Sequence, residues 1–438
     1  MIVTLKRIFI LHVLKWSFRR APLFFKDFIR SFYYKSIYTA KSLKVFRLHS
    51  HRQVPSNIFF YNRFGRFCFA LKEIICFAVF KNKSFKLEYF EQVDENSFAA
   101  REMVYPKPPM YHDGEPVALD RSIFDRIEKS YKLAYDLEPK KIVHSQWWTD
   151  IIAEFKTTFF DSNFKLEIDR LKSFRQTSYT KAAIINDQCA TILREKGIYS
   201  SFLQSLELIM EYHKMSDAID HDILMSISES KIGGSYCPVY RGQRLSQRLL
   251  THAYYVTQLR KFTHIKNNSE TVILDLGGAY GGLLRQIGHY YSKAKLILIE
   301  LPEVVAMGSY FLQAAFPEKK VATLADLKYL SHNSIDLSTA DIFVLPTWCI
   351  ELLETNSIDL VVNSTSLGEM STEYGIFYLE NIERICKRYF FSNNRGTSSI
   401  EKYDDFGFYN WPLKKSWETR LFSTNHTGVI EWIGETNT

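Results

Sequence analysis

The segment with the clearest potential for chemistry combines one carboxylate with a run of glycines. Residues 271–282 read TVILDLGGAYGG, so four apolar or β-branched residues lead to Asp275 and a glycine-rich stretch follows. A buried strand that ends at such a turn and opens a helix forms nucleotide-type pockets in open α/β sheets. Glycines at this turn let the backbone approach a ligand closely, and they can adopt positive φ.

Two cofactors fit this loop. Counted from Gly277, the pattern G-x-A-x-x-G is a degenerate dinucleotide fingerprint. Counted from Asp275, the pattern D-x-G-x-A-x-G resembles the S-adenosylmethionine loop of class I methyltransferases and accounts for one more residue. We therefore expect S-adenosylmethionine to be bound by Asp275, Gly277, Gly278, Ala279, Tyr280 and Gly281. Many class I loops have glycine in place of Ala279, and the alanine costs little if its φ stays negative.

A second acid follows at a spacing that suits the same cofactor. A strand predicted over Lys295–Ile299 places Glu300 at its tip, about twenty residues beyond the glycines. A carboxylate at this position can accept hydrogen bonds from both hydroxyls of a ribose, and Leu301 would lie beside it. The other interpretation of Glu300 is a solvated cap of a helix predicted over Pro302–Phe316.

From about Ile232 onward the chain resembles the sugar O-methyltransferase family of bacterial surface-polysaccharide gene clusters. Three marks carry the resemblance: the glycine loop, the sequence Glu300-Leu301-Pro302-Glu303, and an N-x-x-S-x-x-E-M run from Asn363 to Met370. One departure is a G-x-P-like turn, which has wider spacing here, from Gly234 to Pro238. The resemblance implies an α/β fold with a Rossmann-like seven-stranded methyltransferase domain, S-adenosylmethionine as methyl donor and a sugar hydroxyl as acceptor.

Methyl transfer to a sugar hydroxyl needs a base, because the free hydroxyl is a poor nucleophile. Glu369 is the predicted base, since Leu367 and Met370 would partly desolvate it and raise its pKa. Its other interpretation is a cap of the helix that starts near Ser371. His426 is the second candidate for the base. The residues expected to position cofactor and acceptor are Asn363, Ser364 and Ser366. No Asp/His constellation suits a metal ion, so none is expected.

Hydrophobic periodicity divides the chain into 1–95, a basic aromatic segment, 96–267, a mainly helical region, and 268–438, the Rossmann-like domain. Helices are predicted over Leu119–Leu137, Val143–Phe160, Lys181–Glu195, Phe202–His213 and Ser246–Phe262. Strands are predicted over Thr271–Leu276, Lys295–Ile299, Ala340–Leu345, Asp359–Asn363 and Tyr389–Ser392, with two closing strands between Trp411 and Trp432. The stretch from Glu318 to Thr339 is ambiguous. Trp147 and Trp148 are expected in the core.

A glycine- and proline-containing loop, Ile232–Arg248, precedes the helix that leads into the first strand. So placed, it could line the mouth of the pocket, with Tyr240, Arg241 and Arg244 facing an acidic or phosphorylated substrate. A structural turn with solvated arginines fits the same residues equally well.

The basic charge of the chain is concentrated at its start. Residues 1–52 contain twelve basic residues and one acidic residue, a net charge of +11, whereas the remainder has 44 basic and 47 acidic residues, or −3. Aromatic residues lie between these cations without a sustained helical period, and no apolar run is long enough to span a membrane. The segment could bind a membrane surface, pack on the body of the protein, or bind RNA. The six cysteines are scattered without a C-x-x-C pair, which favours a reducing compartment.

Three functions remain open at this point. The first is a cytoplasmic O-methyltransferase at the inner face of the membrane that modifies a sugar of a surface glycan, with a free, nucleotide-linked or lipid-linked acceptor. The second is an RNA methyltransferase, although we expect no nucleic acid partner. The third is an NAD(P)-binding Rossmann module without this activity, against which Asp275 and Glu369 argue.

Overall fold

The computed structural model describes residues 85–87, 119–138, 146–175, 205, 208–209, 211–235, 237–327, 334–396, 406–424 and 428–436. The predictions for residues 1–52, for the helix Lys181–Glu195 and for His426 lie outside these residues, as does most of the region 202–210.

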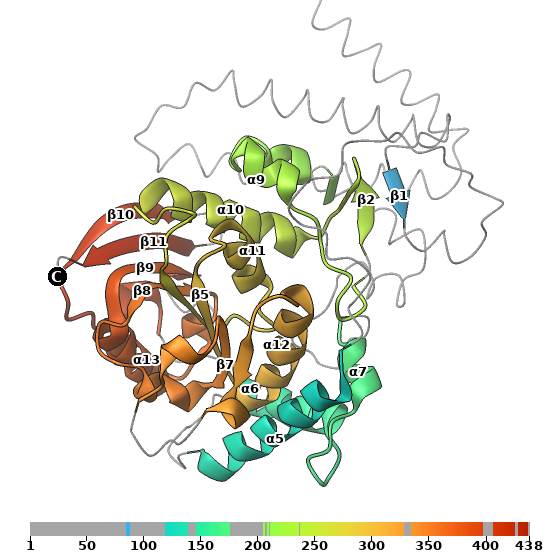
Figure 1. The fold of residues 1–438 in the computed structure, drawn as a ribbon. Coiled ribbons are helices and arrows are strands. Elements are labelled where there is room, and N and C mark those ends of the chain that lie inside the picture. Colours follow the sequence, from blue (N-terminus) through green and yellow to red (C-terminus); the bar gives the residue numbers. More distant parts are fainter. Residues whose placement is uncertain are drawn as a thin grey trace, which may run out of the picture.

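An eight-stranded sheet organises the C-terminal part of the chain (Figure 1). Its order is β10-β11-β9-β8-β4-β5-β7-β6. The strands are β4 (Val272–Leu276), β5 (Lys295–Glu300), β6 (Val321–Thr323), β7 (Ile342–Pro346), β8 (Ile358–Ser364), β9 (Cys386–Arg395), β10 (Trp417–Thr424) and β11 (Val429–Thr436). The strands from β6 to β9 in this order are parallel, and β11 and β10 close the sheet in antiparallel pairings.

The predicted Rossmann-like α/β domain with helices before it is confirmed, although its sheet has eight strands where seven were expected. The additional strand, β6, lies in the ambiguous stretch 318–339 and pairs with the outer side of β7. A strand of three residues is too short to show a hydrophobic period of its own. The other seven strands lie in the segments where strands were predicted, and β9 begins three residues earlier than expected, at Cys386.

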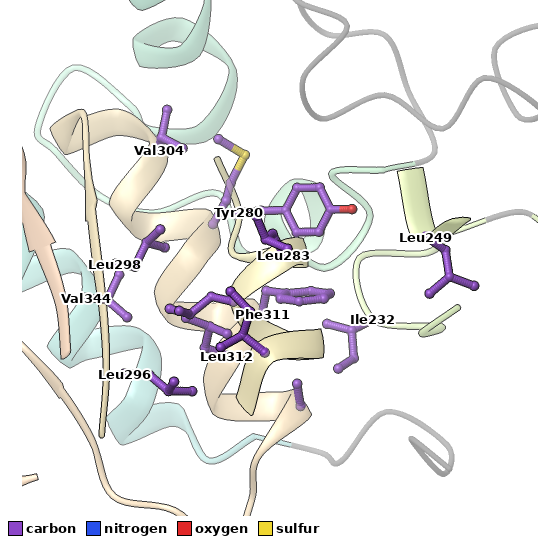
Figure 2. Packing of buried hydrophobic residues seen from close by; sticks show 14 of the residues in the cluster. Ile232, Leu249, Tyr280, Leu283, Leu296, Leu298, Val304, Phe311, Leu312 and Val344 are labelled. Carbon is purple, nitrogen blue, oxygen red and sulfur yellow. The ribbon is translucent and has the colours of Figure 1, made fainter. Parts of the chain in front are cut away.

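Helices cover both faces of the sheet because its parallel strands are apolar on both sides. Along β5, Leu296 and Leu298 belong to one core cluster, whereas Ile297 and Ile299 belong to the other. The first face packs against α10 (Gln247–Phe262), α11 (Gly282–Tyr290) and α12 (Pro302–Ala315), and the second packs against α13 (Thr372–Ile385). Figure 2 shows Leu296, Leu298 and Val344 facing Phe311 and Leu312 of α12.

The helices that precede the sheet domain share its first core cluster. They are α5 (Arg121–Leu137), α6 (Gln146–Phe159), α7 (Ile168–Lys172) and α9 (His221–Ser226). Both α5 and α6 lie beside α12 (Figure 1), and the Arg126 guanidinium donates to Gln313 Oε1 at 3.0 Å. A small sheet of β1 (Phe85–Leu87), β2 (Pro238–Tyr240) and β3 (Gln243–Arg244) lies near α9.

A buried ion pair joins the segment that follows α7 to the segment that follows α9. Arg175, just after α7, lies 3.2 Å from Glu229, and both side chains are buried. The Ser246 hydroxyl at the start of α10 also donates to the Glu229 carboxylate, at 2.5 Å. Burial alone would raise the pKa of Glu229, but Arg175 and Arg285 and these hydrogen bonds lower it to about 2. Removing one partner of such a pair typically costs about 3–5 kcal/mol, so this contact fixes the position of α7 and α10.

Candidate functional site

The glycine loop between β4 and α11 packs tightly against the side chains of Asp275 and Ser366. A Cβ atom on Gly277 would lie 2.2 Å from Ser366 Oγ, and Gly277 has a φ of +69°. A Cβ atom on Gly278 would lie 2.2 Å from a carboxylate oxygen of Asp275. Glycine is therefore required at both positions. The absence of side chains there lets the loop lie directly on Asp275 and Ser366 at the end of β4.

Ala279 does not meet the condition under which an alanine costs little in this loop. Its φ is +52°, in the left-handed region. An alanine there places Cβ close to the following carbonyl oxygen, at a cost of roughly 1–2 kcal/mol. Thr365, another residue at this end of the sheet, has a φ of +64° although it is β-branched. Strained backbone of this kind is concentrated at functional sites.

Asp275 lies beneath the loop with its carboxylate enclosed by protein. Its side chain is 1% exposed, and neither carboxylate oxygen has a hydrogen-bond partner among the described residues. Burial, and to a smaller extent the nearby charge of Glu300, raise the pKa of Asp275 to about 8. The carboxyl group is therefore largely protonated near neutral pH, and a cation bound nearby would favour its ionised form.

Glu300 at the tip of β5 is held against the glycine loop. One carboxylate oxygen accepts the Ala279 N–H at 2.9 Å and the other accepts the Leu301 N–H at 2.6 Å. Burial raises the pKa of Glu300 and these two N–H groups lower it, which leaves it at about 7. The N-cap of α12 is Leu301 and has no side-chain cap bond, so Glu300 does not serve as a solvated helix cap.

A pocket opens at the carboxyl ends of β4, β5, β7 and β8. Its described lining is Trp148, Leu276, Gly277, Ala279, Ile299, Glu300, Leu301, Thr347, Ser364, Thr365, Ser366, Glu369, Met370, Ser371, Tyr374 and Tyr378. Two carboxylates line this pocket, and no lysine, arginine or histidine does so within the described part of the chain. With Asp275 behind the loop, a cationic ligand would favour the ionised forms of all three carboxyl groups.

Glu369 lies in this pocket on the short 3-10 helix η5 (Leu367–Glu369). Burial raises its pKa to about 7, with Arg395 lowering it and Glu300 raising it. A base that titrates near neutrality is well matched to proton abstraction. The cap of α13 is Ser371, whose hydroxyl accepts the Tyr374 N–H at 3.4 Å, so Glu369 is not needed for that role.

Asn363 lies behind the pocket. Its amide nitrogen donates to the Leu276 carbonyl at 2.8 Å and to Ser366 Oγ at 2.6 Å, and its oxygen accepts from Asn394 at 2.9 Å. The side chain is fully buried, and these contacts join the ends of β4, β8 and β9. The structure thus gives Asn363 the role of positioning Ser366 and the loop, with no direct access to the reactants.

Several residues that line the pocket were not predicted from the sequence to do so. Trp148 of α6, expected in the core, packs against the core with one part and lines the pocket with another. The hydroxyl groups of Tyr374 and Tyr378 lie 2.6 Å apart on α13, and Thr347 follows β7. Only the four-residue spacing of the two tyrosines, which places them one helical turn apart, could have indicated that they act together.

Four residues predicted to contact ligands lie elsewhere. Tyr280 is buried, with its ring 4.8 Å from that of Phe311 (Figure 2), because the loop turns this side chain into the core. Tyr240 is buried with its hydroxyl 2.8 Å from His213. Arg244 is buried and donates to the carbonyls of Glu229 and Ser235. Arg241 lies over the Tyr240 ring. The expectation that this hairpin faces an acidic substrate is wrong for Tyr240 and Arg244, whose partners are internal.

Two kinds of feature are absent from the described residues. No group of three or more His, Cys, Asp or Glu side chains could hold a metal ion there. No described helix combines the length and the apolar character that crossing a membrane requires.

Among known proteins, only solved structures show a similarity to this chain. No family model and no curated protein matches the chain. A SAM-dependent methyltransferase of Aquifex aeolicus is 14% identical, over 41% of this chain and 87% of that one, with a TM-score of 0.28. The magnesium protoporphyrin IX methyltransferase of Synechocystis is 11% identical, over 43% and 78%, with a TM-score of 0.30. A phosphoethanolamine N-methyltransferase of Haemonchus contortus is 15% identical, over 34% of this chain and 30% of its own length, with a TM-score of 0.24. Identities this low carry no information on the molecule that this chain would modify.

The strained loop gives a first prediction. Replacing Ala279 with glycine should stabilise the protein by about 1 kcal/mol, because glycine adopts the left-handed conformation without a Cβ penalty. Urea unfolding measures the change. The matched control is Ala153→Gly at an exposed position of α6, which should destabilise the protein by about 1 kcal/mol. A loss of stability in Ala279→Gly would show that the loop does not carry this strain.

Proposed function

We propose that this protein is an S-adenosylmethionine-dependent O-methyltransferase that methylates a sugar hydroxyl of a bacterial surface glycan or of its precursor. The observation that carries the proposal is a single pocket in which the glycine loop, Glu300 and Glu369 meet. The first two suit the cofactor, and the third suits a base for the acceptor.

The residues present fit S-adenosylmethionine. Each carboxylate oxygen of Glu300 accepts one backbone N–H and keeps a lone pair for a ribose hydroxyl. Gly277 and Gly278 let the loop backbone reach the ligand, and the carboxylates of the pocket favour its sulfonium and ammonium charges. When bound, the cofactor supplies an electrophilic methyl group. Asp275 would lower the free energy of the bound cation, since its own oxygens have no other partner in the described structure.

Glu369 would accept the proton of the acceptor hydroxyl as the new carbon–oxygen bond forms and the carbon–sulfur bond breaks. The proton is retained on the Glu369 carboxyl and then passes to solvent. Ser364 and Ser366, which line the same pocket, would hold the hydroxyl in line with the methyl group. Asn363 supports them through its hydrogen bond to Ser366.

The charge of the pocket favours a neutral acceptor over the other two functions. An RNA acceptor and the pyrophosphate of NAD(P) both bring phosphate charge, which the carboxylates would repel. The choice of a sugar among neutral acceptors rests on the resemblance of the run from Asn363 to Met370 to the sugar O-methyltransferase family. Residues 1–52, with a charge of +11, would hold the enzyme at the inner face of the membrane, beside a lipid-linked acceptor.

The cofactor assignment predicts the outcome of calorimetric titration. The wild-type protein should bind S-adenosylmethionine and S-adenosylhomocysteine with micromolar affinity, and Glu300→Ala should weaken both by about tenfold or more. Affinity for the cationic S-adenosylmethionine should rise as the pH increases through about 7, where Glu300 ionises. The control Glu354→Ala, on an exposed side chain, should bind as the wild type does. Binding of NAD(H) alone would overturn the proposal.

The role of Glu369 predicts a selective loss of turnover. Glu369→Gln should lower kcat about 10²- to 10⁴-fold and leave the Kd of S-adenosylmethionine unchanged, because the amide cannot accept the proton. The assay follows S-adenosylhomocysteine release with the methyl glycosides of mannose, rhamnose and fucose as acceptors. The wild-type rate should rise with pH through about 7, as Glu369 loses its proton, and the variant should lack this rise. The control is Glu373→Gln, exposed on the first turn of α13. An unchanged kcat in Glu369→Gln would remove it as the base.

The basic segment predicts binding to anionic membranes. The full chain should sediment with vesicles that contain anionic phospholipids, and a variant without residues 1–52 should remain in the supernatant. Neutral vesicles are the control. Equal sedimentation of the two proteins would contradict the membrane role, and binding of the segment to RNA with a steep salt dependence would favour a nucleic acid partner.

A further inference from the structure

The sheet face under α10 changes from apolar to polar at the edge where the pocket opens. Strands β8, β9 and β11 are in register there, so that Val362, Phe391 and Ile433 form one row across them. All three are buried in the first core cluster. The next row on the same face, toward the carboxyl ends of β8 and β9, consists of Ser364, Asn393 and Glu431. We call these three residues the polar row.

Two tyrosines of α10 lie over the polar row. The Tyr254 hydroxyl donates to Glu431 Oε2 at 2.8 Å, and the Tyr255 hydroxyl lies 3.5 Å from Ser364 Oγ. The Tyr255 ring also packs on Phe391, with 5.2 Å between the ring centroids. The Tyr255 ring therefore covers the apolar row at Phe391, while the hydroxyl groups of both tyrosines meet the polar row.

Glu431 has one oxygen that the described residues leave without a partner. The residue is 6% exposed, and its Oε1 atom has no hydrogen-bond donor. Glu435, four residues further along β11, contrasts with it, because Arg388 and Arg420 bind its two oxygens at 3.0 and 2.6 Å. A buried oxygen without a donor is energetically unfavourable, and a ligand hydroxyl would supply the missing hydrogen bond.

The polar row begins at the pocket. Ser364 lines the pocket at one end of the row. Asn393, in the middle, is half-buried, and its side-chain amide makes no hydrogen bond within the described part of the chain. Its carbonyl accepts the N–H of Thr365, which also lines the pocket, at 2.8 Å. In the strand register, Asn393 and then Glu431 are the next residues beyond Ser364 on the same face of the sheet.

We propose that the polar row binds the acceptor, a neutral polyhydroxyl compound, with Glu431 and Asn393 each taking a hydroxyl next to the one that reacts. This inference rests on the proposed function and assigns the acceptor side of the same site. An amide and a carboxylate in adjacent positions suit adjacent hydroxyls, since the amide both donates and accepts and the carboxylate accepts. Phosphorylated compounds do not fit, because Glu431 would repel them and the row contains no cation.

The test measures binding of the methyl glycosides of mannose, rhamnose and fucose to protein saturated with S-adenosylhomocysteine, by ligand-observed NMR titration. Glu431→Gln keeps the size of the side chain but places an amide where the free oxygen is, and Asn393→Ala removes the second contact. Each variant should weaken glycoside binding about tenfold or more and leave S-adenosylhomocysteine affinity unchanged. The control is Glu418→Gln, the same change at an exposed position on the neighbouring strand β10.

The outcomes separate this inference from the proposed function. Glycoside binding that both variants retain would overturn the role of the polar row and leave the methyltransferase proposal standing. Binding of S-adenosylhomocysteine without any glycoside would overturn the neutral sugar acceptor and this inference with it. No binding of S-adenosylhomocysteine would overturn the methyltransferase proposal itself. If Glu431→Gln does not fold, the half-buried Asn393→Ala decides the same question.

Discussion

Three carboxyl groups are brought into one poorly solvated region at the edge of the sheet, and the surrounding structure is arranged to tolerate them. Glu300 is central, because its charge raises the pKa values of both Asp275 and Glu369. Two backbone N–H groups compensate Glu300, and Arg395 partly compensates Glu369. Asp275 has no such compensation among the described residues. A positively charged ligand would therefore reduce the free-energy cost of ionising these buried carboxyl groups.

The same edge explains why the loop has its unusual backbone. Gly278 can pass directly over the Asp275 carboxylate because it has no side chain, and Gly277 leaves room for Ser366. Ala279 then adopts a positive φ, which directs its N–H toward Glu300. The backbone strain at Ala279 and the hydrogen bond from its N–H to Glu300 therefore belong to the same turn. A change in the φ of Ala279 would also move the N–H away from Glu300.

The sequence indicated the residues that local patterns place, and it did not indicate those that packing brings in. Asp275 and Glu300 each follow a short apolar strand, and parallel strands bring their carboxyl ends together, so their proximity could be predicted. Trp148 reaches the pocket from a helix more than a hundred residues earlier in the chain, and no periodicity encodes that approach. Asn363 looked like a contact to the reactants because it is polar at a strand end, but burial turned it into an internal support. The prediction that Tyr240 and Arg244 contact a substrate was wrong for the same reason. Their polar side chains form hydrogen bonds with other residues of the protein.

The contribution of Trp148 also determines which parts of the chain can be separated. Thirteen of the fourteen residues of α12 are buried, and α5 and α6 lie against that helix. A fragment that began at β4 would keep the glycine loop and all three carboxylates, yet it would expose the apolar surface of α12 to water and lose one wall of the pocket. Such a fragment would contain every strand of the sheet but would leave part of its core uncovered. The helices before the sheet therefore form part of the core of the sheet domain.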